Sequence, residues 1–175
     1  MRKAKFGKGF HMIGAKVGNE SLQLIRELYR YNSRTRKRYL KAIFRKVPAK
    51  ERYKDRGASF PSIVDIFIHI IDAYRFWFLF VCDGKVEEYR RLRETERFTE
   101  RRAREEERRI DSCLHRFLDR LRPSDLKRIV RLGKRTLRLR DILVHMVEEE
   151  LQHRGELNAL FWQMGVEPPL VEWGG

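Results

Sequence analysis

The chain has 175 residues, of which 42% are hydrophobic, and this suits one globular domain with a sizeable core. Its net charge is +15 and 37% of its residues are charged. That composition fits a heat-adapted protein with many surface ion pairs somewhat better than a nucleic-acid-binding protein, because charge alone reports solubility and non-specific association.

Two cysteines, Cys82 and Cys113, lie far apart and form no CxxC pair, which argues against a disulfide scaffold and favours a reducing, cytoplasmic location. Residues 1–17 lack the continuous apolar stretch of a signal peptide. The apolar run at 63–81 is interrupted by charged residues and predicts a buried helix instead of a membrane span.

Helix-breaking residues divide the rest of the chain into four predicted helices. The first runs from about residue 20 to residue 46, with apolar residues at helical spacing, and ends at Pro48. The second covers about 62–83, and Ser62 with Asp65 at its start resembles a capping box.

The third predicted helix spans about 86–121. Its first two-thirds is charge-dense and predicts either a solvated, salt-bridged face or a frayed extension, whereas its end is amphipathic. Pro123 and Gly133 interrupt a connector that is expected to contain a short helical turn. The fourth helix runs over about 139–164, with Gly165 as its C-cap.

The sequence shows no alternating strand pattern and no internal repeat, so the predicted fold is an all-α four-helix bundle. The bundle is expected to cover 19–170 as a single domain. Residues 1–18 form a basic N-terminal arm, expected to be flexible, and 171–175 form a short tail.

The fourth predicted helix carries His145, Glu149 and His153, each one turn from the next. Side chains at i and i+4 lie about 5–6 Å apart at Cβ and can chelate one ion, whereas positions eight apart are separated by about 12 Å of rise. The candidate pair is therefore Glu149 with His153, or His145 with Glu149, and a third ligand must come from elsewhere. His69 in the second helix is the candidate. A lone core histidine is more often a hydrogen-bonding residue, but bundle metal sites are commonly built from facing helices.

Two imidazoles and one carboxylate would leave coordination positions open for water or substrate, as in catalytic zinc and non-haem iron sites. The segment 141–169, with His-Arg-Gly-Glu at 153–156, resembles the last helix of the DinB/YfiT-like family. That helix typically ends in His-Arg-Gly-Gln or His-Arg-Gly-Glu, followed by an apolar stretch, Gly and Pro. His69 followed by Trp77 resembles the family's second helix, and 31–48 resembles its first.

The resemblance implies a DinB/YfiT-like four-helix bundle with a divalent metal held by His69, Glu149 and His153. Glu149 stands where the better-known members have a histidine, so the metal is open among Zn, Ni, Fe and Mn, and weak or absent binding is also open. His145 is expected either to pair with Glu149 as a substitute ligand or, the role we favour, to contact the ligands or the pocket without binding the metal. The resemblance further implies a transferase that uses a low-molecular-weight thiol, or a hydrolase, with a small-molecule substrate and a homodimeric assembly.

The alternative function is a metal-free basic helical bundle that binds nucleic acid or another anionic partner. Cations gather at 26–46 and 120–140, and would contact phosphates if both stretches share one face. No nucleic-acid-binding motif accompanies them. Arg154 is expected to pair with a carboxylate such as Asp141 or Glu150, with orientation of an anionic substrate as the alternative, and Glu148 and Glu150 are expected to be solvated or ion-paired.

Overall fold

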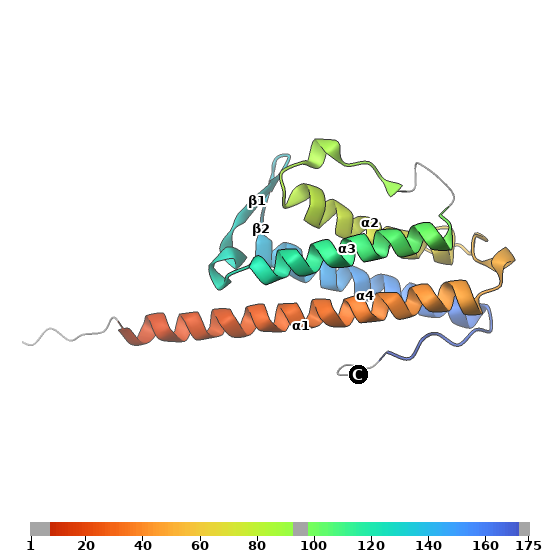
Figure 1. The fold of residues 1–175 in the computed structure, drawn as a ribbon, viewed down its shortest axis with the longest axis horizontal. Helices are drawn as coiled ribbons and strands as arrows, with labels where there is room; N and C mark the ends of the chain where they lie inside the picture. The colour runs from red at the N-terminus through yellow and green to blue at the C-terminus, as the bar shows by residue number, and fades with distance from the viewer. Residues whose placement is uncertain (1–7, 93–97, 172–175) are drawn as a thin grey trace, which may run out of the picture.

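The computed structural model describes residues 8–92 and 98–171. Its four helices are α1 (Lys8–Lys46), α2 (Ile63–Tyr74), α3 (Glu100–Arg120) and α4 (Leu139–Gln163), which form one bundle (Figure 1). α2 packs mainly on α4, and α1 packs against both α3 and α4. The predicted all-α four-helix bundle is confirmed. Within the described ranges, no helix combines the length and the apolar character needed to cross a membrane.

α2 begins where the sequence predicts. Ser62 is its N-cap, and the Ser62 hydroxyl oxygen accepts a hydrogen bond of 3.2 Å from the backbone N–H of Asp65. Beyond Tyr74 the chain continues as a wider π-type helical segment over Arg75–Val81. Such segments hold one extra residue per turn and occur frequently at functional sites. Here the segment places Trp77 on the wall of the same cavity as His69 of α2.

The predicted start of the third helix at residue 86 is wrong, because α3 begins at Glu100. A short 3-10 turn forms at Val86–Glu88. The next residue, Tyr89, packs edge-on against aromatic rings of the π-type segment, and its hydroxyl donates a 2.5 Å hydrogen bond to Asp72 of α2. These tertiary contacts hold the segment against α2 in place of a helical extension. Residues 93–97 lie outside the described residues.

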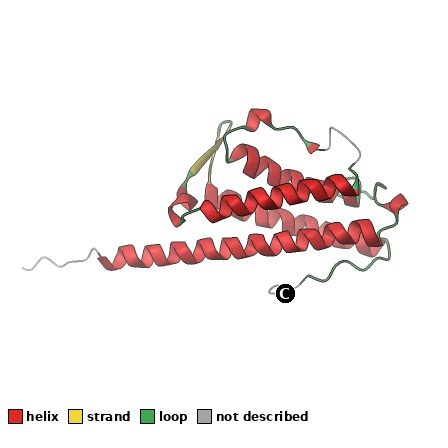
Figure 2. Cartoon of the chain, viewed as in Figure 1, coloured by secondary structure: helices red, strands yellow, loops and turns green. Residues whose placement is uncertain are grey.

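A two-stranded antiparallel hairpin occupies the connector between α3 and α4, where no strand was predicted. β1 (Ile129–Leu132) pairs with β2 (Arg135–Arg138), and Val130 lies opposite Leu137 (Figure 2). Gly133 has φ 55° in the two-residue connection, a conformation that favours glycine. The strands are four residues each, too short and too rich in arginine for a clear alternating pattern. The predicted short helical turn is present before them, at Pro123–Lys127.

α1 begins at Lys8, earlier than the predicted start near residue 20, so helix occupies part of the stretch predicted as an arm. The helix has 39 residues, and its N-terminal end extends well past the other helices (Figure 1). At about 1.5 Å per residue it is roughly 58 Å long. Residues 1–7 and 172–175 lie outside the described residues, so the flexible arm over 1–18 and the tail over 171–175 stay predictions.

A layer of buried polar side chains crosses the bundle between α1, α2, α3 and α4; we call Arg36, Tyr74, Glu107 and Glu150 the buried charge layer. Arg36 Nη1 donates a 2.8 Å hydrogen bond to Glu150 Oε2, and the Tyr74 hydroxyl donates to the same oxygen at 2.6 Å. Arg36 Nε lies 3.8 Å from Glu107 Oε1. Burial lowers the pKa of Arg36, but Glu150, Tyr74 and Glu107 outweigh it and raise that pKa above its usual value. Arg36 therefore remains a cation inside the core.

Candidate metal centre

The structure brings His69 of α2 together with Glu149 and His153 of α4. His69 Nε2 lies 2.9 Å from Glu149 Oε1, and His153 Nε2 lies 3.3 Å from the same oxygen. One ligand atom from each of the three residues falls within 4.8 Å of the other two. The arrangement arises because α2 packs directly on α4, and because positions 149 and 153 share one face of α4.

The other ring nitrogen of His153 is held by a carboxylate. His153 Nδ1 lies 3.2 Å from Glu156 Oε2, and the Ser59 hydroxyl donates to the same Glu156 oxygen. A histidine that binds a metal commonly donates its second N–H to a carboxylate, which fixes the tautomer and turns the free nitrogen toward the ion. The pairing with Glu156 therefore leaves Nε2 of His153 to face Glu149.

An aromatic side chain covers the two histidines. The ring of Phe60 stacks on His69 with centroids 4.1 Å apart and an interplanar angle of 25°, and its centroid lies 5.6 Å from that of His153. Phe60 belongs to the loop that leads into α2. Its ring shields the cluster from water on this side, and a lower local dielectric strengthens every charge interaction inside.

The pKa shifts favour the protonation states that bind metals. Burial lowers the pKa of His69, and the nearby charge of His153 lowers it further, against the opposing effect of Glu149. Burial raises the pKa of Glu149, but the hydrogen bond with His69 and the charges of His153 and His69 outweigh burial, so this pKa lies below its usual value. At neutral pH His69 is a neutral imidazole and Glu149 is a carboxylate, the forms in which each side chain acts as a ligand.

A cavity of about 300 Å³ opens beside the cluster. Its walls combine aromatic rings with a few polar groups, and are formed by Phe60, His69, Asp72, Ala73, Phe76, Trp77, Tyr89, Arg91 and Glu149. Small-molecule sites commonly have this character, mostly apolar with few polar groups that fix orientation. A larger cavity of about 530 Å³ lies elsewhere, at the base of the hairpin, and shares no lining residue with this one.

The donor set fits one transition-metal ion. Typical Zn–N and Zn–O distances of about 2.0–2.2 Å place neighbouring ligand atoms of one ion roughly 2.9–3.4 Å apart. The two separations at Glu149 Oε1, 2.9 and 3.3 Å, lie in this range. Two imidazoles and one carboxylate occur in catalytic zinc sites and in non-haem Fe(II) sites, both of which keep positions open.

The remaining residues singled out in the sequence lie outside the cluster. His145 is exposed, and its ring meets that of Trp77 edge-on with centroids 5.7 Å apart. Arg154 is buried but pairs with neither predicted carboxylate; its Nη2 donates to Asn32 Oδ1 at 3.4 Å and its guanidinium lies over the Tyr31 ring. The prediction that Arg154 pairs with Asp141 or Glu150 is therefore wrong. Glu148 is exposed, and Glu150 is buried and ion-paired with Arg36. Both outcomes match the prediction that these glutamates are solvated or ion-paired.

Sequence reasoning missed two groups that complete the cluster. Glu156 follows His153 by three residues, and this i, i+3 spacing on a helix is a signal that would have found it. Phe60 lies before α2 in a loop, and nothing in the sequence pattern places its ring over His69. The cavity residues Tyr89 and Arg91 were hidden because their segment was predicted to be helical.

Comparison with known proteins agrees with this architecture. A DinB-like protein of Bacillus subtilis, YjoA, has a crystal structure that matches with a TM-score of 0.64 and 17% sequence identity, over 85% of this chain and 99% of that chain. At this identity the match shows the fold alone. No curated protein matches the chain. The family model described as "DinB family" matches residues 17–174, nearly the whole length, and the chain therefore belongs to the DinB family.

Proposed function

We propose that this chain binds one divalent transition metal through His69, Glu149 and His153, and that it acts on a small molecule in the adjacent cavity. The observation that carries the proposal is the convergence of three ligand atoms within 4.8 Å of one another on two facing helices. The contact of His153 Nδ1 with Glu156 supports it, because a histidine that binds a metal commonly donates its second N–H to a carboxylate.

The reaction class we propose is a thiol-dependent transferase or a hydrolase. A bound cation stabilises the deprotonated form of a thiol or of water and so supplies a nucleophile at neutral pH. Membership of a family whose characterised members include thiol-using transferases supports the first class. The ion is Zn, Ni, Fe or Mn, all of which accept this donor set.

The chain's own residues have separable tasks in this proposal. Phe60 excludes water from one side of the ligands, and Glu156 orients His153. Arg91 at the cavity wall brings a cation to a substrate that carries a carboxylate or phosphate. Asp72 accepts a hydrogen bond from Tyr89 and so fixes the segment that forms this wall.

The test is the metal content of protein purified without chelators, measured by elemental analysis after reconstitution with each of the four ions. The wild type is expected to hold about one equivalent, and His153→Ala and Glu149→Gln are expected to lose it. The matched control is His145→Ala, which removes an exposed imidazole from the same helix and should leave the metal content unchanged.

A second readout is thermal unfolding. An ion that binds only the folded chain at 100 times its Kd adds about 2.7 kcal/mol, which raises Tm by roughly 5–10 °C for a protein of this size. No bound metal in the reconstituted wild type would refute the proposal. Loss of metal in His145→Ala with retention in His153→Ala would assign the ion to other residues.

We also infer a homodimer and a cytoplasmic location, as expected from the sequence. Three exposed apolar side chains, Val144, Leu151 and Trp162, lie on one face of α4 at spacings of seven and eleven residues. A second copy packed on this face would remove them from water. The two cysteines are free thiols, which supports a reducing compartment.

A further inference from the structure

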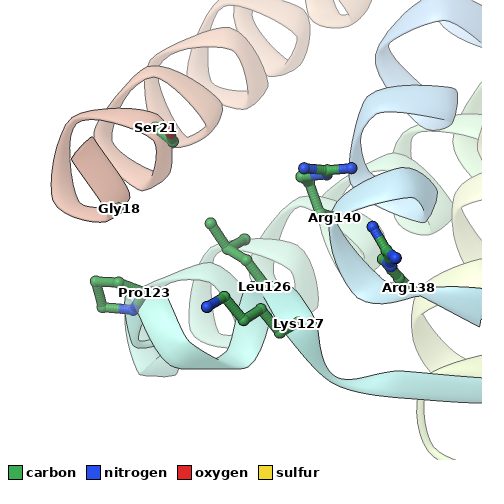
Figure 3. Close-up of a pocket in the computed structure, with 7 residues that line it drawn as sticks. All are labelled: Gly18, Ser21, Pro123, Leu126, Lys127, Arg138 and Arg140. Carbon is green, nitrogen blue, oxygen red and sulfur yellow. The ribbon is translucent and has the colours of Figure 1, made fainter. Parts of the chain in front are cut away.

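The larger cavity, of about 530 Å³, lies at the base of the hairpin between α1, the Pro123–Lys127 turn and the start of α4. Figure 3 shows Lys127 on the turn and Arg138 with Arg140 at the start of α4, around the side chain of Leu126, with Gly18 of α1 across the opening. Pro123 and Leu126 give the cavity an apolar floor beside the three cations.

Among the side chains that the structure describes, no carboxylate lines this cavity. Among the described residues, neither Lys127 nor Arg138 has an acidic partner within the 4.0 Å of an ion pair. Arg140 Nε lies 3.2 Å from Asp141 Oδ1, and Arg140 remains 56% exposed. The cavity therefore concentrates positive charge that the protein itself neutralises only in part.

The cations of α3 show the opposite arrangement. Its charge-dense half forms i, i+4 ion pairs along the helix, as the sequence predicts: Arg104 with Glu100, Arg101 with Glu105, and Arg102 with Glu106. In contrast, the segment 126–140 has seven cations and no acid: Lys127, Arg128, Arg131, Lys134, Arg135, Arg138 and Arg140. All seven are exposed. The positive charge of the chain is thus unbalanced at the hairpin and at the cavity below it.

The start of α4 adds to this field. Arg138 is the N-cap of the helix and supplies no side-chain capping hydrogen bond. The first N–H groups of a helix lack partners within the helix, and its N-terminus carries a partial positive charge. Because α4 starts beside the cavity, its dipole and the arginine side chains favour an anion at the same place.

We propose that this cavity binds a small phosphate ester whose apolar part rests on Leu126 and Pro123. Guanidinium groups bind phosphate oxygens through paired N–H donors, and Arg138 and Arg140 present two such groups. The apolar floor favours a small molecule with an apolar part over a nucleic-acid backbone, which is a repeating polyanion bound through many phosphate contacts. The site is separate from the metal centre, since Arg140 and Glu149 are nine residues, or about 13 Å, apart along α4.

The test is calorimetric titration of the full chain with phenyl phosphate at about 0.15 M salt, where long-range attraction is screened. The pocket variant is Arg138→Ala with Arg140→Ala. The control, Arg101→Ala with Arg104→Ala, removes the same charge from α3, where neither side chain lines this cavity. The pocket variant is expected to bind at least roughly tenfold more weakly, and the control to stay within about twofold of wild type. Circular dichroism checks that both variants are folded.

His153→Ala is expected to bind phenyl phosphate like the wild type, which separates this site from the metal centre. Equal weakening in the pocket variant and the control would show a general charge effect and overturn the proposal. Absence of binding to the wild type would also overturn it. Binding of a labelled single-stranded oligonucleotide in the absence of any binding of phenyl phosphate would assign the surface to nucleic acid instead.

Discussion

Removal of the charge of Glu150 is expected to destabilise the protein far more than removal of an exposed carboxylate. Glu150 is 0% exposed and accepts hydrogen bonds from Arg36 at 2.8 Å and from Tyr74 at 2.6 Å. In Glu150→Gln the amide oxygen still accepts a hydrogen bond, but Glu107, at 3.8 Å, is then the one counter-charge that Arg36 has among the described residues. Breaking a buried ion pair costs about 3–5 kcal/mol. We expect about 3 kcal/mol, because one hydrogen bond remains.

The assay is urea unfolding followed by circular dichroism, with thermal unfolding as a second measure. A loss of about 3 kcal/mol corresponds to a fall in Tm of roughly 6–12 °C for this chain length. The control is Glu105→Gln, the same chemical change in a pair with Arg101 whose side chains are 39% and 84% exposed. Such a pair contributes about 0.5 kcal/mol or less. A difference below about 1 kcal/mol between the two variants would refute the assignment of Glu150 as the central anion of the buried charge layer.

Three further predictions concern substitutions or modification of single residues. Burial raises the pKa of Cys82 to about 11 from 9.0. In a Cys113→Ser background, alkylation of Cys82 at pH 8 should therefore be about 100-fold slower than alkylation of an unperturbed thiol. The alkylation rate should rise about tenfold per pH unit up to about pH 10. Gly165→Ala should lower the free energy of unfolding by about 1 kcal/mol because φ is 66°, whereas Gly155→Ala inside α4 should raise it by about 0.5–1 kcal/mol; equal effects in urea unfolding would contradict both. Leu151→Glu should halve the mass measured by sedimentation if a second copy covers α4, and a monomeric wild type would exclude that dimer.

The bundle and the cluster of ligand candidates were predictable because both depend on helical spacing. Glu149 and His153 share a face of α4 by their four-residue separation alone, and the apolar stretch around His69 required α2 to lie in the core. The inference that His69 of α2 lies beside Glu149 and His153 of α4 also needed the resemblance of the C-terminal motif to the family's last helix. The metal ligation itself stays a prediction.

Features that depend on contacts between distant segments were not predictable. Residues 86–92 contain helix-forming residues, yet Tyr89 packs against the π-type segment and holds the chain out of a helix. The hairpin strands are too short to give a periodic sequence pattern. The burial of Arg36 was not predictable either, because it lies within a helix rich in surface cations. In each case tertiary packing overrides local propensity.

The length of α1 has a consequence for how the bundle finds its alignment. A helix that extends past its neighbours at one end can slide by one turn, about 5.4 Å, and still span their length. Such a slip would move Arg36 away from Glu150 and leave two opposite charges buried without partners. Apolar contacts are not directional, whereas an ion pair with its hydrogen bonds requires one alignment. The buried ion pair of Arg36 and Glu150 therefore fixes the register of α1 along α4.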